Sequence, residues 1–427
     1  MELSTAKGTN DILPEEKIAR DEMLSKIKTV FELYGYSPLE TPAIERYDIL
    51  ASKYAGGAEI LKETFKFKDQ GDRDLGLRYD LTVPFSRVVG MNPNLKMPFK
   101  RYQIDKVWRD GPIGLGRYRE FVQCDVDIVG CKSVIAESEL MAIAQEVLKR
   151  LNLKGFIRAN NRKLLNGLVR EFAKTEKVEE TILSIDKLEK IGREGVKKEL
   201  AEKGIIVSDE LFKALEEKNL EKLKKKLKDP ESLEGIKELE DFFSFAKSFG
   251  ATIVEFDPSL ARGLAYYTGT IFEILLQEGS IKSSVGGGGR YDKMIGNFLE
   301  SKQEYPAVGI SFGLDRLFDS LNSLKRIEVK KRVARVFVIP IKELNKSIEF
   351  IQLLRTNGIK SDIDLMERGI SKNLDFANTL EIPFVAFLGP EEVKKESVKI
   401  RNMKTGKEEV VKWKDADYSV PIVIPMV

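Results

Sequence analysis

The sequence predicts an α+β domain with a mixed, mostly antiparallel sheet flanked by helices, a helical insertion inside that domain, and an α/β domain at the C-terminal end. Three observations support this prediction. Short segments with alternating polar and apolar residues are typical of antiparallel strands. A Lys/Glu/Leu-rich stretch with few aromatic residues is typical of helices. Beyond it, strand-like segments alternate with helical ones, which favours a parallel or mixed sheet.

Changes in composition give the predicted boundaries. The first domain covers residues 1–164 and resumes over residues 251–325, where strand-like sequence returns. The Lys/Glu/Leu-rich stretch between them, residues 165–250, is the predicted helical insertion. A linker of mixed charge then leads to the α/β domain of residues 331–427. A chain of 427 residues has room for this division at about 150 residues per domain.

Two long helices are predicted in the first domain. One begins near Pro14, because proline suits a first helical turn, and ends at Gly35. Its apolar residues recur at helical spacing and are Ile27, Val30, Phe31 and Tyr34. The other covers residues 133–151, and its apolar stripe consists of Leu140, Ala144, Val147, Leu148 and Leu151.

Extended segments surround these helices. Alternation predicts strands over residues 36–42, 44–53, 65–67, 75–79 and 100–108, and again over residues 251–256 and 270–276. In the C-terminal domain, strands over residues 333–340, 360–365 and 384–388 alternate with helices that end near residue 355 and cover residues 372–380.

Histidine is absent from the chain, and its absence excludes several chemistries. A Ser-His-Asp triad, a His general base and a His-ligated metal all require imidazole. The two cysteines, Cys124 and Cys131, fit no CxxC motif, and their odd spacing would place them on opposite faces of a strand. We expect two reduced thiols in a cytoplasmic protein, because no segment resembles a signal peptide or a membrane span.

The charge balance says little about partners. With 71 Lys+Arg and 68 Asp+Glu, the net charge is 71 − 68 = +3, so nucleic-acid binding would depend on local patches. The lysine run at residues 224–228 could contact RNA phosphates, but such runs more often form solvated helix faces.

Residues 100–130 form the most informative stretch. Its second half alternates strictly, and Phe121, Gln123, Asp125 and Asp127 share one face of the predicted strand. The first half adds four arginines around a turn rich in glycine: Arg101, Arg109, Arg117 and Arg119. Guanidinium groups bind phosphate and carboxylate in a bidentate manner, so the predicted hairpin is a candidate phosphate clamp.

Two glycine-containing segments complete the pattern. Gly286–Gly289 allow close approach of a ligand or of backbone, although turn flexibility explains such a run equally well. Neither a Walker A loop nor a GxGxxG loop that opens a helix is present. Residues 306–321 predict a strand that turns into a helix, with Arg316 near the helix N-terminus, and such a junction favours a polyanion.

Taken together, these segments resemble the class II aminoacyl-tRNA synthetases. The segment WRDGPIGLGRYREF is similar to their motif 2, AVGISFGLDRL to motif 3, and YGYSPLETPAI to motif 1 at the dimer interface. Within this class, LRYDLTVPFSR, LARGLAYYTGTIFE and GGGGRYD resemble segments of the histidyl-tRNA synthetases. The resemblance spans nearly the whole chain.

The resemblance implies a two-step reaction. Histidine and ATP form histidyl-adenylate, and the histidyl group is transferred to the 3′ end of tRNA(His), with release of pyrophosphate and AMP. The amino acid's own carboxylate attacks the α-phosphorus, so no histidine base is needed, and catalysis rests on alignment and on positive charge. The family uses Mg²⁺ with ATP, forms homodimers and carries a C-terminal anticodon-binding domain.

The resemblance also implies residue roles. Arg109 would hold the α-phosphate, while Arg316 would reach the γ-phosphate and cover adenine opposite Phe121. Arg262 would lie beside the substrate carboxylate and the α-phosphate and act as the chief electrostatic catalyst.

For the amino acid, the resemblance implies two groups of residues. The α-ammonium group would be bound by Asp80, Thr82 and Gln123, and the two imidazole nitrogens by Asp127 and Tyr267. A carboxylate with a phenol suits a ring that has two nitrogens. Asp125 is either structural or a Mg²⁺ ligand, and the ligands of Mg²⁺ stay unassigned. Arg117 and Arg368 are candidate tRNA contacts.

The chain departs from the family pattern at two positions. In motif 2 the acid follows the arginine directly, as Asp110, and Gly111 stands where the class pattern has a Glu. In the 260–273 segment Ala265 stands where the family often has an Asp, and this position is given no role.

Other functions remain possible at this point. A regulatory subunit of histidine biosynthesis resembles the same catalytic domain, but it typically lacks the C-terminal domain and the catalytic arginines, which this chain has. A class II synthetase for another amino acid conflicts with the 260–273 segment.

Overall fold

The computed structural model describes residues 3–52, 58–173, 175–262, 266–301 and 303–412. Ala265 therefore lies outside the described residues. The chain divides into two compact units. One consists of Met1–Asp11 with Met23–Arg326, and the other of Ile12–Glu22 with Ile327–Val427.

An eight-stranded sheet forms the centre of the first unit, with strand order β1-β5-β6-β11-β10-β9-β7-β8. Among the described strands of this sheet, only the β1–β5 and β7–β8 pairs are parallel, so the sheet is mixed and mostly antiparallel, as predicted. The strands are β1 (Ser37–Pro38), β5 (Phe99–Trp108), β6 (Glu120–Val129), β7 (Gly155–Asn161), β8 (Val254–Phe256), β9 (Thr270–Leu276), β10 (Gly286–Arg290) and β11 (Ala307–Gly313).

Helices α1 (Pro14–Leu33) and α5 (Ile135–Arg150) are the two predicted long helices. The predicted stripe of α5 is buried throughout, and Ile27, Val30 and Phe31 of α1 are inaccessible to solvent. Phe31 packs against Tyr102 of β5, with ring centroids 5.7 Å apart. The apolar stripes therefore attach these helices to the sheet, because burial of a Leu, Val or Phe side chain stabilises by about 1.5–3 kcal/mol.

A second, three-stranded sheet has the order β2-β4-β3. It consists of β2 (Ile44–Arg46), β3 (Lys66–Lys68) and β4 (Asp74–Leu77). The predicted strand over residues 44–53 is confirmed only for its first three residues, because the chain then turns into α2 (Tyr47–Leu50). Residue 53 lies outside the described residues. This turn carries Leu50 into a buried cluster with Tyr79 and Val83, which a continuing strand would not reach.

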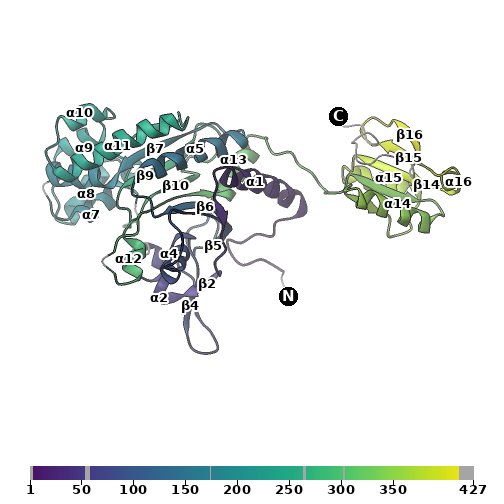
Figure 1. Cartoon of the computed structure of the whole chain (residues 1–427), viewed down its shortest axis with the longest axis horizontal. Helices are drawn as coiled ribbons and strands as arrows, with labels where there is room; N and C mark the ends of the chain where they lie inside the picture. Colours follow the sequence, from purple (N-terminus) through teal and green to yellow (C-terminus); the bar gives the residue numbers. More distant parts are fainter. Residues whose placement is uncertain (1–2, 53–57, 174, 263–265, 302, 413–427) are drawn as a thin grey trace. The chain divides into compact units, whose positions relative to one another are not determined.

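The middle of the chain is helical, as predicted, and its small helices gather at one end of the first unit (Figure 1). Its elements are α6 (Arg162–Leu168), the π-helical turn Val169–Ala173, α7 (Val178–Ile185), α8 (Leu188–Glu202), α9 (Asp209–Leu215), α10 (Leu220–Lys224) and α11 (Pro230–Ser248). Close packing of α6 on α11 requires glycine, since a Cβ at Gly235 would lie 2.7 Å from the nitrogen of Leu164.

The second unit contains a mixed five-stranded sheet of order β13-β12-β14-β15-β16, which confirms the predicted α/β domain. Its strands are β12 (Val336–Pro340), β13 (Ser361–Ile363), β14 (Phe384–Leu388), β15 (Ser397–Asn402) and β16 (Glu408–Lys412). Its helices are α14 (Leu344–Thr356), α15 (Ile370–Thr379) and α16 (Pro390–Lys394). The first three strands pair in parallel, and β15 and β16 add antiparallel pairs.

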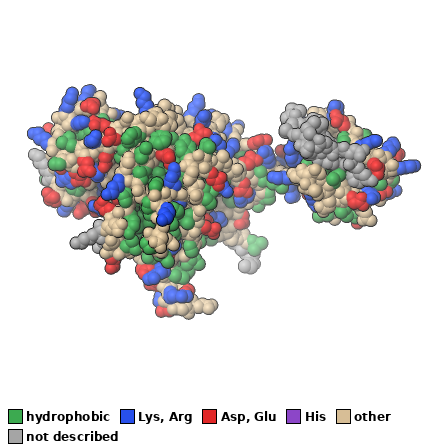
Figure 2. All heavy atoms as spheres, in the orientation of Figure 1, with side chains coloured by type: hydrophobic (Ala, Val, Ile, Leu, Met, Phe, Trp, Pro, Cys, Tyr) green, Lys and Arg blue, Asp and Glu red, His purple; other side chains and the backbone are tan. Residues whose placement is uncertain are grey.

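The surface mixes both signs of charge, as the near-neutral balance predicts (Figure 2). Lys224, the last residue of α10, pairs with Glu240 at 2.6 Å. The rest of the lysine run lies beyond the helix, where Leu227 is buried. Cys124 and Cys131 are both free thiols. Among the described helices, none is long and apolar enough to cross a membrane.

Candidate active site

A cavity of about 420 Å³ lies against the eight-stranded sheet, within the usual range of about 300–1,000 Å³ for small-molecule sites. Its walls come from β6, β10 and β11, from the β5–β6 hairpin loop, and from α4 (Thr82–Met91) and α13 (Leu314–Ser323). All nine candidate residues line it: Asp80, Thr82, Arg109, Phe121, Gln123, Asp127, Arg262, Tyr267 and Arg316. The fold thus brings together residues that are far apart in the sequence.

Asp127 is a buried carboxylate with two close partners. The register of β5 and β6 sets Arg101 opposite Asp127, and Nη2 of Arg101 lies 2.8 Å from Oδ2 of Asp127. The Tyr291 hydroxyl donates to Oδ1 of Asp127 at 2.6 Å. Burial raises the pKa of Asp127, and Arg101 opposes that rise. These contacts fix the position of the carboxylate, and breaking such a buried pair is costly.

Asp125 lies on the same face of β6 and is 2% exposed. Its Oδ1 has no hydrogen-bond partner among the described residues. Burial is the main reason that the pKa of Asp125 is raised to about 7; Arg101 opposes this rise, and the neighbouring Asp127 adds to it. The cavity wall therefore offers an unsatisfied acceptor beside Asp127.

Polar groups continue along this face and across the cavity. The side-chain nitrogen of Gln123 donates to the Ser311 hydroxyl at 3.1 Å. Asp80 precedes α4, where its Oδ1 accepts from the Val83 backbone nitrogen at 3.0 Å. Burial raises the pKa of Asp80 to about 6. The carboxylates of Asp80, Asp125 and Asp127 and the amide oxygen of Gln123 thus line a cavity that a cationic amine could enter.

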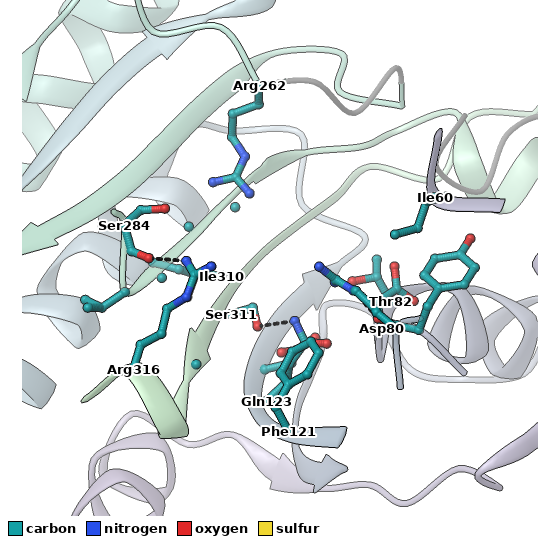
Figure 3. Close-up of a pocket in the computed structure, with 18 of the residues that line it drawn as sticks. Ile60, Asp80, Thr82, Phe121, Gln123, Arg262, Ser284, Ile310, Ser311 and Arg316 are labelled. Atoms are coloured by element: carbon teal, nitrogen blue, oxygen red, sulfur yellow. Dashed lines mark hydrogen bonds between the residues drawn. The ribbon is translucent and has the colours of Figure 1, made fainter. Parts of the chain in front are cut away.

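Arg262 and Arg316 point into the cavity from separate segments (Figure 3), and Arg109 lines it as well. Arg109 donates to the Tyr79 carbonyl at 3.0 Å, and its guanidinium carbon lies 5.2 Å from the centroid of the Phe121 ring. Arg316, in the first turn of α13, donates to the carbonyls of Gly116 and Ser284 at 3.1 and 2.5 Å. Burial lowers the pKa of Arg316, and the neighbouring arginines lower it further, so these cations lie near one another.

The third guanidinium is that of Arg262, which donates to the Phe272 carbonyl at 3.2 Å and lies 3.5 Å from Glu273. Its guanidinium carbon is 5.7 Å from the centroid of the Tyr267 ring. Both residues pack on the glycine strand β10, where a Cβ at Gly287 would lie 1.9 Å from Nη1 of Arg262 and one at Gly289 would lie 2.7 Å from Tyr267. The glycines therefore serve close approach within a strand, and the alternative interpretation as a flexible turn is wrong.

The predicted phosphate clamp needs correction. Arg101 is fully buried in its pair with Asp127, and Arg119 pairs with Asp110 at 2.8 Å. Of the four hairpin arginines, only Arg109 and Arg117 line the cavity. The register of β5 and β6 explains why Arg101 does not line the cavity, because it places the Asp127 carboxylate opposite Arg101.

Sequence reasoning missed several residues of the cavity. Tyr291, Ser311 and Ser284 form the hydrogen bonds described above, and Ile60, Glu63, Tyr79 and Tyr266 also line the walls. Tyr291 and Tyr266 lie inside the segments that resemble the family, and this location could have indicated that they line the cavity. Nothing in the sequence around Glu63 indicated its position.

This fold and this site define a class II aminoacyl-tRNA synthetase. A mostly antiparallel sheet holds a motif 2 hairpin next to a motif 3 strand and helix, and three arginines from separate segments meet in one cavity.

Comparison with known proteins gives the particular family. The family model for histidyl-tRNA synthetase matches residues 8–317, and that for the anticodon binding domain matches residues 335–417. The chain is 46% identical over 418 residues to histidine–tRNA ligase 1 of Bacillus cereus (strain ATCC 10987 / NRS 248), covering 96% of this chain and 95% of the relative. It is 37% identical to the histidine–tRNA ligase of Clostridium tetani, covering 97% of each.

The chain therefore belongs to the histidyl-tRNA synthetase family, and it is a histidine–tRNA ligase. A solved structure of histidyl-tRNA synthetase from Nostoc sp. PCC 7120 is similar at a TM-score of 0.83 and 29% identity, covering 96% of this chain and 97% of that one. A structure described as an ATP phosphoribosyltransferase regulatory subunit/histidyl-tRNA synthetase from Bacillus halodurans C has a TM-score of 0.74 at 21% identity, a likeness of fold alone. The match to the anticodon binding domain favours the ligase over the regulatory subunit.

Proposed function

We propose that the cavity binds ATP and histidine side by side and aligns them for adenylate formation. The observation that supports this proposal is the meeting of Arg109, Arg262 and Arg316 in one cavity with buried acidic groups. Cations stabilise the charge that develops on phosphorus, and acids bind the substrate's ammonium group.

For ATP, Arg109 holds the α-phosphate, and Arg316 reaches the γ-phosphate. The adenine ring lies between Arg316 and Phe121. The planar guanidinium group of Arg316 suits both tasks, since it binds phosphate oxygens and stacks on rings. Burial lowers the pKa of Arg316 and the neighbouring arginines lower it further, so a bound polyanion would stabilise its charged form.

For histidine, Asp80, Thr82 and Gln123 bind the α-ammonium group, and Asp127 and Tyr267 bind the imidazole nitrogens. Ring isosteres without these nitrogens are rejected, because they offer no N–H donor to the acceptor sites of Asp127 that Arg101 and Tyr291 leave open. The buried partners of Asp127, Arg101 and Tyr291, support this assignment by fixing the acceptor before the substrate arrives.

The reaction then needs no protein base. The substrate carboxylate attacks the α-phosphorus, the bond to the β-phosphate oxygen breaks, and pyrophosphate leaves with the bonding electrons. Arg262 and Arg109 stabilise the charge on the pentavalent phosphorus, with Arg262 as the chief electrostatic catalyst.

Magnesium belongs to this proposal as part of the ATP substrate. The described residues contain no group of three acidic or thiol side chains suited to a metal ion. Mg²⁺ that is bound with a nucleotide usually takes its ligands mainly from phosphates and water.

We also propose the division of the chain into a catalytic domain of residues 1–164 and 251–325, a helical insertion of residues 165–250, and an anticodon-binding domain of residues 331–427. The two family models support the separation of the last domain, because one match ends at residue 317 and the other begins at residue 335. Cytoplasmic residence and homodimer formation complete the proposal.

The test is ATP–pyrophosphate exchange in the absence of tRNA. We expect exchange with histidine and none above background with threonine, proline or glycine. Asp127→Ala should raise the KM for histidine at least about tenfold, as loss of a charged hydrogen bond predicts, with little change in the KM for ATP. Equal changes in both constants would contradict the assignment.

A further inference from the structure

Glu63 is a carboxylate of the cavity wall that the roles above leave unused. It follows α3 (Ala58–Lys62) and lines the same cavity as Arg109 and Asp80. The residue is half-buried. Within the part of the chain that the structure describes, no ion pair or hydrogen bond joins its carboxylate to another side chain. A carboxylate next to a substrate cavity with open acceptor sites is available to a hydrogen-bond donor of a ligand.

The backbone fixes Glu63 against the motif 2 hairpin. Its carbonyl accepts from the nitrogen of Asp110 at 2.7 Å. A Cβ at Gly111 would lie 3.0 Å from the carboxyl carbon and from both carboxylate oxygens of Glu63. The carboxylate therefore occupies the space beside the residue where the class pattern has a Glu. The acid missing from the hairpin is supplied by another segment.

The position within the cavity favours the second step of the reaction. The Ile60 carbonyl accepts from the nitrogen of Glu63 at 3.1 Å, and Ile60 lies on the same side as Asp80 and Thr82, across from Arg316 (Figure 3). In the proposed function this is the amino-acid side, whereas adenine lies between Phe121 and Arg316. The acyl carbon of histidyl-adenylate would lie on this side too, so a nucleophile bound here would be close to it.

The chemistry of a carboxylate restricts the kind of ligand that Glu63 can bind. A carboxylate attracts hydroxyl donors and repels phosphate oxygens, so Glu63 suits a ribose better than a triphosphate. We propose that Glu63 binds the terminal ribose of tRNA(His) through a hydroxyl group and orients it for attack on histidyl-adenylate. This inference rests on the proposed function of the cavity.

The step that Glu63 assists balances without a further reactant. The ribose oxygen forms an ester bond with the acyl carbon, the bond between that carbon and the adenylate oxygen breaks, and AMP leaves with the electron pair. The hydroxyl proton departs with AMP. Glu63 accepts a hydrogen bond and orients the nucleophile, and alignment of this kind is a main source of rate.

The experiment separates the two steps in the full-length enzyme. ATP–pyrophosphate exchange reports adenylate formation, and single-turnover transfer from preformed histidyl-adenylate to tRNA(His) reports the second step. For Glu63→Ala we expect transfer to slow about 10- to 100-fold, the effect of losing one charge-assisted hydrogen bond. Exchange should change by no more than about twofold by the same reasoning, because the lost contact is absent from the first step.

Two further variants sharpen the test. Gly111→Glu in the Glu63→Ala background returns a carboxylate to the same space from the hairpin and should recover at least part of the transfer rate. Glu255→Ala, at an exposed position of β8 outside the cavity, is the matched control for removing one acid. Unchanged transfer in Glu63→Ala, or an equal loss in exchange and transfer, would overturn the inference. Absence of exchange in the unmodified enzyme would instead contradict the proposed function.

Discussion

Arg262 is held in place by protein contacts before any substrate binds. Its guanidinium donates to the Phe272 carbonyl and lies near Glu273, and it packs beside the Tyr267 ring. A preorganised cation of this kind stabilises a transition state without reorganisation, which makes it more effective than a mobile one.

Replacement of Arg262 should therefore affect turnover more than binding. For Arg262→Ala we expect kcat for adenylate formation to fall about 10²- to 10³-fold, as for loss of an oxyanion donor, with smaller changes in both KM values. Arg262→Lys keeps the positive charge but lacks the planar guanidinium group, so its kcat should lie between those of the unmodified enzyme and Arg262→Ala. Steady-state exchange measures these constants, and full turnover in Arg262→Ala would disprove the role.

The buried acid Asp125 links stability to pH. Burial raises its pKa to about 7 in the folded chain, whereas an unfolded Asp titrates near 3.9. Between these values the folded chain keeps a proton that the unfolded chain has lost. Raising the pH through this window therefore lowers the free energy of unfolding.

Asp125→Asn removes this penalty. We expect the variant to gain stability over the parent chain as pH rises, by about 3 kcal/mol more at pH 8 than at pH 5. Urea denaturation at the two pH values measures the difference. Asp11→Asn, at an exposed position, is the control and should show no such trend. A gain that is equal at both pH values would contradict the assignment.

At this scale the sequence indicates which side chains face the cavity but not their partners. Strict alternation places Gln123, Asp125 and Asp127 on one face of a strand, and this prediction is confirmed by β6. The pairing of Arg101 with Asp127 depends on register between two strands, which the pattern of one strand does not specify.

The glycines of β10 and β11 matter at the scale of elements, because they set how closely side chains approach the sheet. A Cβ at Gly309 would lie 1.9 Å from Oδ1 of Asp127. At this distance either the backbone or the Asp127 carboxylate would have to move to make room for the Cβ. The sequence could not separate this requirement from turn flexibility, because both favour glycine.

Gly309→Ala should therefore displace the Asp127 carboxylate from its position at the ring nitrogens. We expect the KM for histidine to rise at least about tenfold, comparable to loss of one charged hydrogen bond, while exchange at saturating histidine persists. Gly369→Ala is a suitable control, since its Cβ would meet nothing within 4 Å. An unchanged KM in Gly309→Ala would show that Asp127 does not contact the substrate.

The elements themselves were predicted to different degrees. Long periodic segments such as α1, α5 and the β5–β6 hairpin were predicted to within a few residues. The short helix α2 was not, because four residues carry too little periodicity to outweigh an extended pattern. A tertiary contact, the burial of Leu50, decides its conformation.

At the scale of the whole molecule, the motif 1 segment leaves apolar side chains uncovered in a single chain. Leu33 is 66% exposed and Ile44 is 50% exposed. These residues flank β1, which lies at the edge of the eight-stranded sheet. An exposed apolar surface beside a sheet edge favours association.

We expect sedimentation of the full chain to give twice the mass of one chain. Ile44→Asp places a charge in the expected interface and should shift the equilibrium toward monomer. Ile206→Asp, at a position 89% exposed in the helical insertion, should leave the mass unchanged. A monomer for the unmodified chain at micromolar concentration would contradict the homodimer.

Arg101 and Tyr291 fix Asp127 at the proposed imidazole site, and the chain itself contains no histidine. These two features together make the bound imidazole accessible to NMR. Every imidazole resonance in a nitrogen NMR spectrum of the complex must arise from the ligand. The signals of bound histidine would therefore show its tautomer and charge without overlap from protein imidazole signals. The chemical shifts of its two ring nitrogens would reveal which of them faces a carboxylate and which a phenol, with no isotope labelling of the protein.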